Sequence, residues 1–113
     1  MGKNELAEKI NQLKILVEKI LEERKFDYET RDFELDFKDF MNNIKFFYKS
    51  SLENILTKRV TKQTVDDLSN AIDNLNSMKN IAQKYNDNNL ANYIQSIINE
   101  LEGMKNRLKP LAK

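Results

Sequence analysis

Apolar residues recur every three or four positions in four separate stretches of this chain. The clearest stretch lies near the end, at Leu90, Ile94, Ile97, Leu101, Met104, Leu108 and Leu111. Because an α-helix turns by about 100° per residue, this spacing places all of these side chains along one side of a helix. Such a stripe has to be buried, so the pattern predicts helices that pack against one another through their apolar sides.

Capping residues, rather than strong helix breakers, must separate the helices, because the chain has only two glycines and one proline. We predict helices at about 4–25, 30–58, 64–85 and 90–109. Asn4 is a candidate N-cap of the first helix. Before the third helix, Thr61 and Thr64 are both candidate caps, and Thr64 with Asp67 approximates a capping box. Residues 87–89 form the last turn, and Pro110 ends the fourth helix.

The start of the second helix is ambiguous. Residues 33, 35 and 37 are apolar and alternate as in a strand, whereas apolar steps of three or four run from Phe33 to Phe47 as in a helix. A single strand would have no partner elsewhere in the chain, so we prefer the helix. Four helices with short joints are antiparallel neighbours. We therefore predict an all-α protein, an antiparallel up-down-up-down four-helix bundle, with residues 1–113 in a single domain.

The composition argues against several kinds of chemistry. The 113 residues include no histidine and no cysteine. Zinc sites, Ser-His-Asp triads, Glu-x-x-His di-iron sites and thiolate chemistry all depend on these residues. No apolar run approaches the length that spans a bilayer, and the N-terminus lacks the apolar core of a signal peptide. We expect a cytoplasmic protein that is not an enzyme, binds no cofactor and does not enter a membrane.

Two large apolar residues do not fit the stripe of the second helix. Leu35 and Phe46 lie about 180° from it, close to Asp39 and Lys49. Exposed apolar residues are common singly, but large aromatic residues are also typical anchors of protein interfaces. We predict protein binding through Leu35, Phe46, Lys49 and Asp39. Ile15 of the first helix is similarly opposed to its stripe.

Basic residues form two groups that suggest an alternative function. The groups are Lys45, Lys49, Lys58, Arg59 and Lys62, and then Lys105, Arg107, Lys109 and Lys113. Residues 40–113 carry 11 basic and seven acidic side chains, a net charge of +4. Such groups bind nucleic-acid phosphates, but lysine and arginine near helix C-termini also complement the helix dipole. Nucleic-acid binding is therefore possible but not favoured.

Acidic pairs near the N-terminus suggest a third, least favoured function. Glu5-x-x-Glu8 and Glu29-x-x-Asp32 resemble the Glu-Glu-x-x-Glu and Glu-x-x-Asp motifs of all-α nucleotide pyrophosphohydrolases. This resemblance implies carboxylates on adjacent helices around Mg²⁺ and a nucleotide pyrophosphate, although Asn4 replaces one acidic residue of the first motif. The simpler interpretation is acidic residues near helix starts. The favoured expectation is a small binding protein whose partner is an unknown protein or a second copy of itself.

Overall fold

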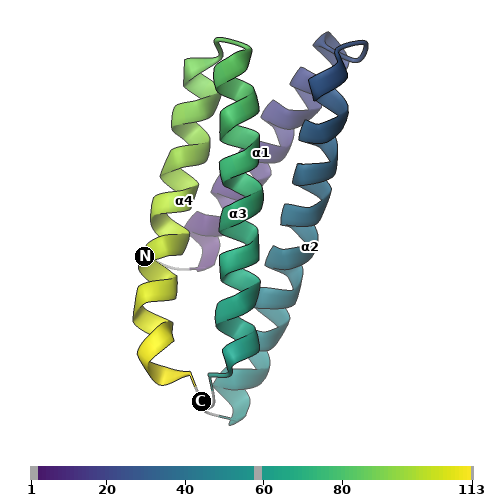
Figure 1. Ribbon diagram of the computed structural model, residues 1–113. Coiled ribbons are helices and arrows are strands. Elements are labelled where there is room, and N and C mark those ends of the chain that lie inside the picture. Colours follow the sequence, from purple (N-terminus) through teal and green to yellow (C-terminus); the bar gives the residue numbers. More distant parts are fainter. Residues whose placement is uncertain (1–2, 58–59, 113) are drawn as a thin grey trace.

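The computed structural model describes residues 3–57 and 60–112, with side chains for 5–49 and 60–112, and these residues form four α-helices. The helices are α1 (Lys3–Glu23), α2 (Tyr28–Thr57), α3 (Lys62–Lys84) and α4 (Asn88–Leu108), followed by the short 3₁₀ helix η1 (Lys109–Leu111). They alternate in direction, as Figure 1 shows, and none is long and apolar enough to cross a membrane. The prediction of an all-α, up-down-up-down four-helix bundle is confirmed, and the ambiguous segment around Phe33 is helical.

The helices do not pack equally. α3 packs closely against both α2 and α4, whereas α1 makes looser contacts with α4 and α2. In Figure 1, α1 crosses obliquely behind the other three helices, from beside α4 to the upper end of α2. α3 is therefore the helix that lies closely between two neighbours.

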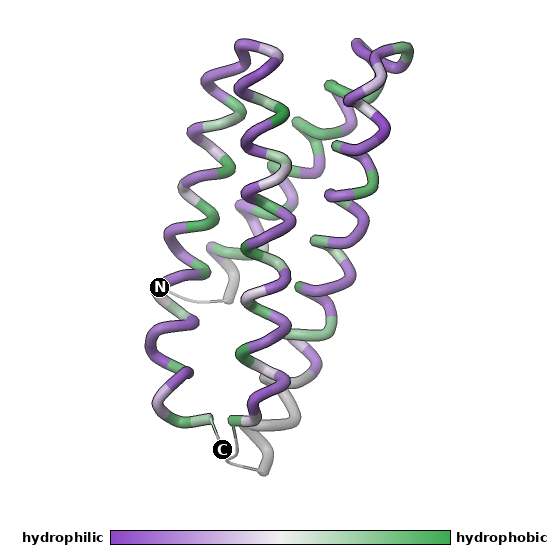
Figure 2. The backbone as a smooth tube through the Cα atoms, in the orientation of Figure 1, coloured by the Kyte–Doolittle hydropathy of each residue, from purple (hydrophilic) through white to green (hydrophobic). Residues whose placement is uncertain are grey.

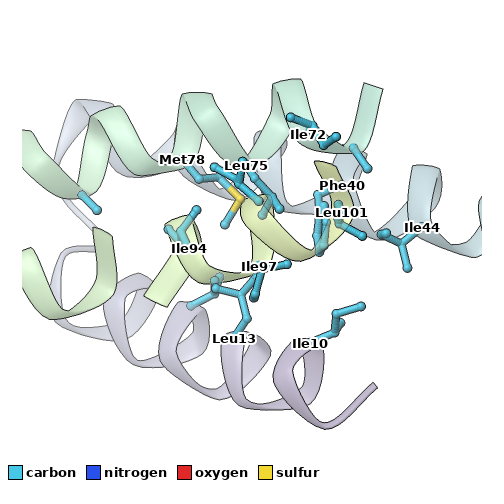
Figure 3. Packing of buried hydrophobic residues seen from close by; sticks show 14 of the residues in the cluster. Ile10, Leu13, Phe40, Ile44, Ile72, Leu75, Met78, Ile94, Ile97 and Leu101 are labelled. Carbon is cyan, nitrogen blue, oxygen red and sulfur yellow. The ribbon is translucent and has the colours of Figure 1, made fainter. Parts of the chain in front are cut away.

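The core is built from the predicted stripes. Figure 2 shows hydrophobic segments recurring along every helix. Each helix contributes fully buried side chains, among them Leu13, Phe40, Leu75 and Ile97. These side chains meet in one cluster between the helices (Figure 3). Burial of large apolar side chains contributes about 1.5–3 kcal/mol each, so this cluster is the main stabilising feature of the bundle.

Side-chain caps define two of the turns. The Thr61 hydroxyl accepts a hydrogen bond from the Thr64 backbone N–H, so Thr61 is the N-cap of α3. The predicted capping box is wrong, since Thr64 lies inside the helix and Asp67 instead accepts a hydrogen bond from Gln63. Asp87 caps α4 through the backbone N–H of Leu90, as expected for the turn at 87–89. The helix boundaries at both turns therefore follow from short polar side chains.

The structure also corrects the predicted start of α1. Asn4 lies inside this helix, which begins at Lys3, so Asn4 does not cap it. Gly103 lies exposed on α4, and a Cβ atom placed there would have no neighbouring atom within 4 Å. The glycine is therefore tolerated on an outer side of the helix. No close helix contact depends on it.

Candidate interaction surface

All four residues predicted to bind a protein lie exposed on one side of α2. Leu35 and Phe46 have 49% and 56% of their surface exposed. Asp39 and Lys49 are also exposed and lie on the same side. We call this surface the α2 outer face and define it by the exposed residues Asp32, Leu35, Asp39, Asn42, Phe46 and Lys49. The opposite side of α2 carries Phe33, Phe40 and Phe47 into the core, which is why the outer face is turned to solvent.

The sequence interpretation missed Tyr28 as a continuation of this face. Tyr28 is the first residue of α2 and is 94% exposed. It lies seven positions before Leu35, two helical turns, and so on the same side of the helix. The predicted start of the helix near Thr30 placed Tyr28 in a loop. The seven-residue spacing was the signal that would have included it.

The turn between α1 and α2 is held in place beside this aromatic residue. Arg24 lies 3.0 Å from Asp27 and stacks over the ring of Tyr85, 4.1 Å from its centre. Phe26, by contrast, is 92% exposed, with Lys25 near its ring. Phe26 of the turn and Tyr28 at the start of α2 thus both point into solvent. Arg24 fastens the turn to Tyr85 at the end of α3.

Negative charge gathers along one side of the α2 outer face. Burial raises the pKa of Asp36, and the neighbouring carboxylates Asp32 and Asp39 raise it further. Among the described side chains, neither Asp32, Asp39 nor Lys49 forms an ion pair within the chain. Among the described residues, the face therefore carries unpaired charges of both signs alongside two exposed apolar side chains. Such a combination suits the binding of a protein surface rather than of a small molecule.

Ile15 does not extend this surface. It is exposed on α1, where the side chains around it on the helix surface are polar or charged, including Asn11, Glu18 and Lys19. A single apolar residue in polar surroundings is common on protein surfaces. We assign it no binding role.

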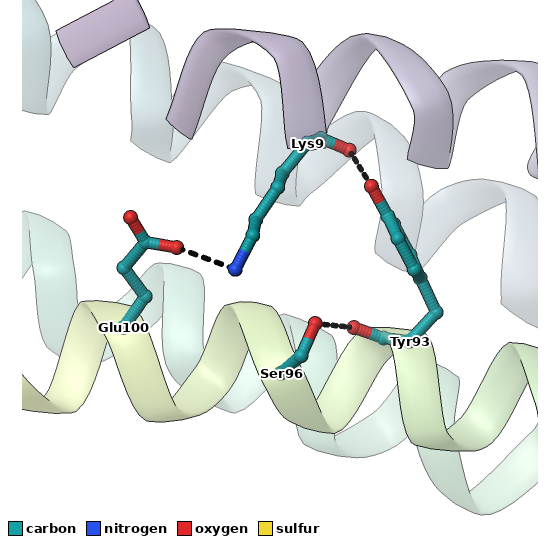
Figure 4. Close-up of polar contacts among 4 residues, drawn as sticks. All are labelled: Lys9, Tyr93, Ser96 and Glu100. Atoms are coloured by element: carbon teal, nitrogen blue, oxygen red, sulfur yellow. Dashed lines mark hydrogen bonds and ion pairs between the residues drawn. The ribbon is translucent and has the colours of Figure 1, made fainter. Parts of the chain in front are cut away.

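A polar cluster joins α1 to α4 (Figure 4). The Lys9 ammonium lies 3.0 Å from the Glu100 carboxylate, and the Tyr93 hydroxyl donates to the Lys9 carbonyl oxygen. The hydroxyl of Tyr48 on α2 is buried and has no hydrogen-bond partner among the described residues. Its pKa is raised by burial and by the Glu100 carboxylate. These contacts fasten the obliquely crossing α1 to α4, and we assign the cluster a structural role.

The structure brings the two basic groups of the sequence together in part. Lys62 at the start of α3, Lys105 near the end of α4 and Lys109 at the start of η1 line one open pocket of about 420 Å³. Asp66 and Ser69 also line it. Lys45, Lys49 and Arg107 do not line this pocket, and Lys58, Arg59 and Lys113 lie outside the described residues. Of the six predicted bases that the structure describes, three therefore meet, beside one carboxylate that offsets part of their charge.

The acidic residues of the resemblance do not form a metal site. In the described part of the chain, which includes Glu5, Glu8, Glu29 and Asp32, no group of three or more acidic side chains is arranged to hold a metal ion. α1 and α2 are antiparallel and joined by a short turn, so residues near the start of α1 lie far from those at the start of α2. The expected convergence of the two pairs is therefore not found.

Comparisons with known proteins do not connect this chain to any of them. No protein family, curated protein or solved structure matches it. The fold defines a small all-α four-helix bundle, and bundles of this kind carry many unrelated functions, so its function has to be inferred from its surface.

Proposed function

We propose that this protein is a non-enzymatic binding protein that acts through the α2 outer face. The observation that carries the proposal is the exposure of Leu35 and Phe46 on the same side of one helix. They are separated by three helical turns, about 16 Å, so both can contact a single partner. While they are exposed, these two large apolar side chains add nothing to the stability of the bundle. Their burial in an interface would contribute favourable free energy of binding.

The charges around these two residues support the same interpretation. Asp39 and Lys49 lie beside the apolar pair without an ion-pair partner among the described side chains. Charged residues at the edge of an interface steer association and reject unsuitable partners. Apolar anchors provide the affinity, and the surrounding charges provide the specificity.

Site-specific photo-cross-linking in cells tests this proposal. A photoreactive amino acid replaces Asn42 in the centre of the face, and the control carries it at Asn92, an exposed asparagine on α4. We expect covalent adducts from position 42 that disappear when Leu35 and Phe46 are both replaced by serine. Adducts from neither position, or equal adducts from both, would contradict the proposal.

The double serine variant must keep its fold for this comparison to be valid. Because both side chains are exposed, its helix content measured by circular dichroism and its melting temperature should match those of the wild type. A collapse of the fold would show that the two residues stabilise the bundle rather than bind a partner.

A second candidate function is the binding of a polyanion at the pocket of Lys62, Lys105 and Lys109. What favours it is the meeting of three ammonium groups at the end of the α3–α4 pair where α3 begins and α4 finishes. Gel-shift titration with single- and double-stranded DNA and RNA at two salt concentrations tests it, because phosphate binding weakens as salt rises. Replacement of Lys105 and Lys109 by glutamine should abolish a salt-sensitive shift, and no shift at micromolar protein would eliminate this candidate.

A further inference from the structure

The α2 outer face has a regular internal order. Its six residues follow one another at intervals of three, four, three, four and three positions: Asp32, Leu35, Asp39, Asn42, Phe46 and Lys49. This alternation of three and four is the spacing at which one helix meets another along a seam. All six residues are exposed, so the seam is open over its whole length.

When the six residues are read in reverse order, each one meets a residue of complementary chemistry in the forward order. The intervals read the same from either end, and the two ends of the series are Asp32 and Lys49. The next pair inward is Leu35 with Phe46, and the innermost pair is Asp39 with Asn42. Each pair therefore combines an acid with a base, two apolar side chains, or a hydrogen-bond acceptor with a donor.

We propose that the α2 outer face binds the same face of a second copy of this chain, with the two α2 helices antiparallel. A two-fold axis perpendicular to α2 passes between Asp39 and Asn42. It places Asp32 opposite Lys49 of the second copy and Leu35 opposite Phe46 of the second copy. Because the interface is symmetric, every contact occurs twice, which yields two ion pairs, two apolar contacts and two hydrogen bonds.

The charges decide between the two possible directions of the helices. A parallel arrangement pairs each residue with itself, so Asp32 and Asp39 would each face the same carboxylate, and Lys49 would face the same ammonium. The antiparallel arrangement replaces these repulsions with attractions. It also brings Lys38 of each copy near Lys45 of the other copy along one edge of the seam. Lys38 lies 3.8 Å from Glu34, and both lysines are exposed, so solvent screens the repulsion between them.

This inference rests on the proposed function, since it assigns a partner to the same face. It predicts a weak dimer, because only two apolar residues from each copy enter the seam. Light scattering from low-micromolar to near-millimolar concentration should show the mass rising from the monomer value of 13.4 kDa towards twice that value.

Two charge reversals test the antiparallel order. Asp32→Lys places a base opposite Lys49 of the second copy, and Lys49→Asp places an acid opposite Asp32 of the second copy. Each variant alone should remain monomeric. An equimolar mixture of the two variants should dimerise like the wild type, because both pairs of a mixed dimer are again opposite in charge. Glu18→Lys, an exposed reversal on α1, is the control and should dimerise normally.

Single-cysteine variants give the direction of the helices directly, since the natural chain has no cysteine. In a mixture of Asp39→Cys and Asn42→Cys, the antiparallel dimer favours the mixed disulfide over either symmetric one. A predominance of symmetric disulfides would overturn the antiparallel arrangement. Circular dichroism of every variant checks that the bundle is intact.

The two proposals fail in different ways. A wild-type protein that stays monomeric at near-millimolar concentration, or reversal variants that dimerise unchanged, would overturn self-association. If position 42 still cross-links in cells to a different protein, the binding function stands without the second copy. If the cross-linked product has twice the monomer mass and contains only this chain, both proposals are supported.

Discussion

The hydroxyl oxygens of Thr30 and Tyr85 lie 2.7 Å apart, although 55 positions separate the two residues in the chain. Thr30 is buried near the start of α2, and Tyr85 directly follows α3. Arg24 stacks over the ring of the same tyrosine, so Tyr85 connects the α1–α2 turn with the α3–α4 turn. This contact fixes the end of the bundle at which α2 begins.

Replacing Tyr85 with phenylalanine should remove that connection. The ring remains, but the buried Thr30 hydroxyl loses its partner, and we expect the free energy of unfolding to fall by about 1 kcal/mol. Urea denaturation measures the change. Tyr28→Phe removes a hydroxyl from a side chain that is 94% exposed and should leave stability unaltered. Equal effects of the two substitutions would refute this role for Tyr85.

Two phenylalanines of α2 should respond very differently to truncation. Phe40 is fully buried, so Phe40→Ala leaves a cavity and should cost about 3–5 kcal/mol of unfolding free energy. Phe46 is 56% exposed on the outer face, and Phe46→Ala should cost less than about 1 kcal/mol in the monomer. Thermal unfolding at a concentration where the protein is monomeric distinguishes them. A large loss from Phe46→Ala would place that residue in the core.

Gly103 offers a stabilising substitution. It lies inside α4 with no atom within 4 Å of the position a Cβ would occupy. Alanine lowers the conformational entropy of the unfolded chain and suits a helix, so Gly103→Ala should raise the free energy of unfolding by about 0.5–1 kcal/mol. Denaturant titration of the two proteins provides the measurement. A decrease would mean that another surface approaches the helix at this point.

Stability should respond to pH through Asp36. The pKa of this carboxyl is raised by burial and by Asp32 and Asp39, so its charged form is less favourable in the folded than in the unfolded chain. The ionised carboxylate of Asp36 therefore lowers the free energy of unfolding when the pH lies above the pKa that Asp36 has in the folded chain. This loss of stability disappears as the pH falls through the ordinary pKa range of an aspartate. Asp36→Asn should therefore raise the melting temperature at neutral pH but not under acidic conditions.

Comparison of the two melting temperatures across pH tests the assignment to Asp36. The control is Glu18→Gln, which likewise removes one carboxylate but from the exposed side of α1. An Asp36→Asn protein that is no more stable than the wild type at neutral pH would show that the three carboxylates do not repel one another appreciably.

Spacing alone determined the helices of this protein and the side of each that is buried. The steps of three and four from Phe33 to Phe47 outweighed the strand-like alternation around Leu35, and the same rule placed Leu35 and Phe46 opposite the core. Both are exposed in the structure. Tyr28 was missed only because the predicted start of α2 was two residues late. The angular position of a residue around a helix axis depends on its residue number, which is why the buried and exposed sides of each helix could be predicted.

Only the tertiary structure decided which helices meet and how. The oblique crossing of α1, the contact of Thr30 with Tyr85 and the convergence of Lys62 with Lys105 and Lys109 join segments far apart in the chain. The spacing within one helix contains no information about its angle or height relative to another. Those quantities follow from how the side chains of two helices interdigitate, and that depends on all the packed surfaces together.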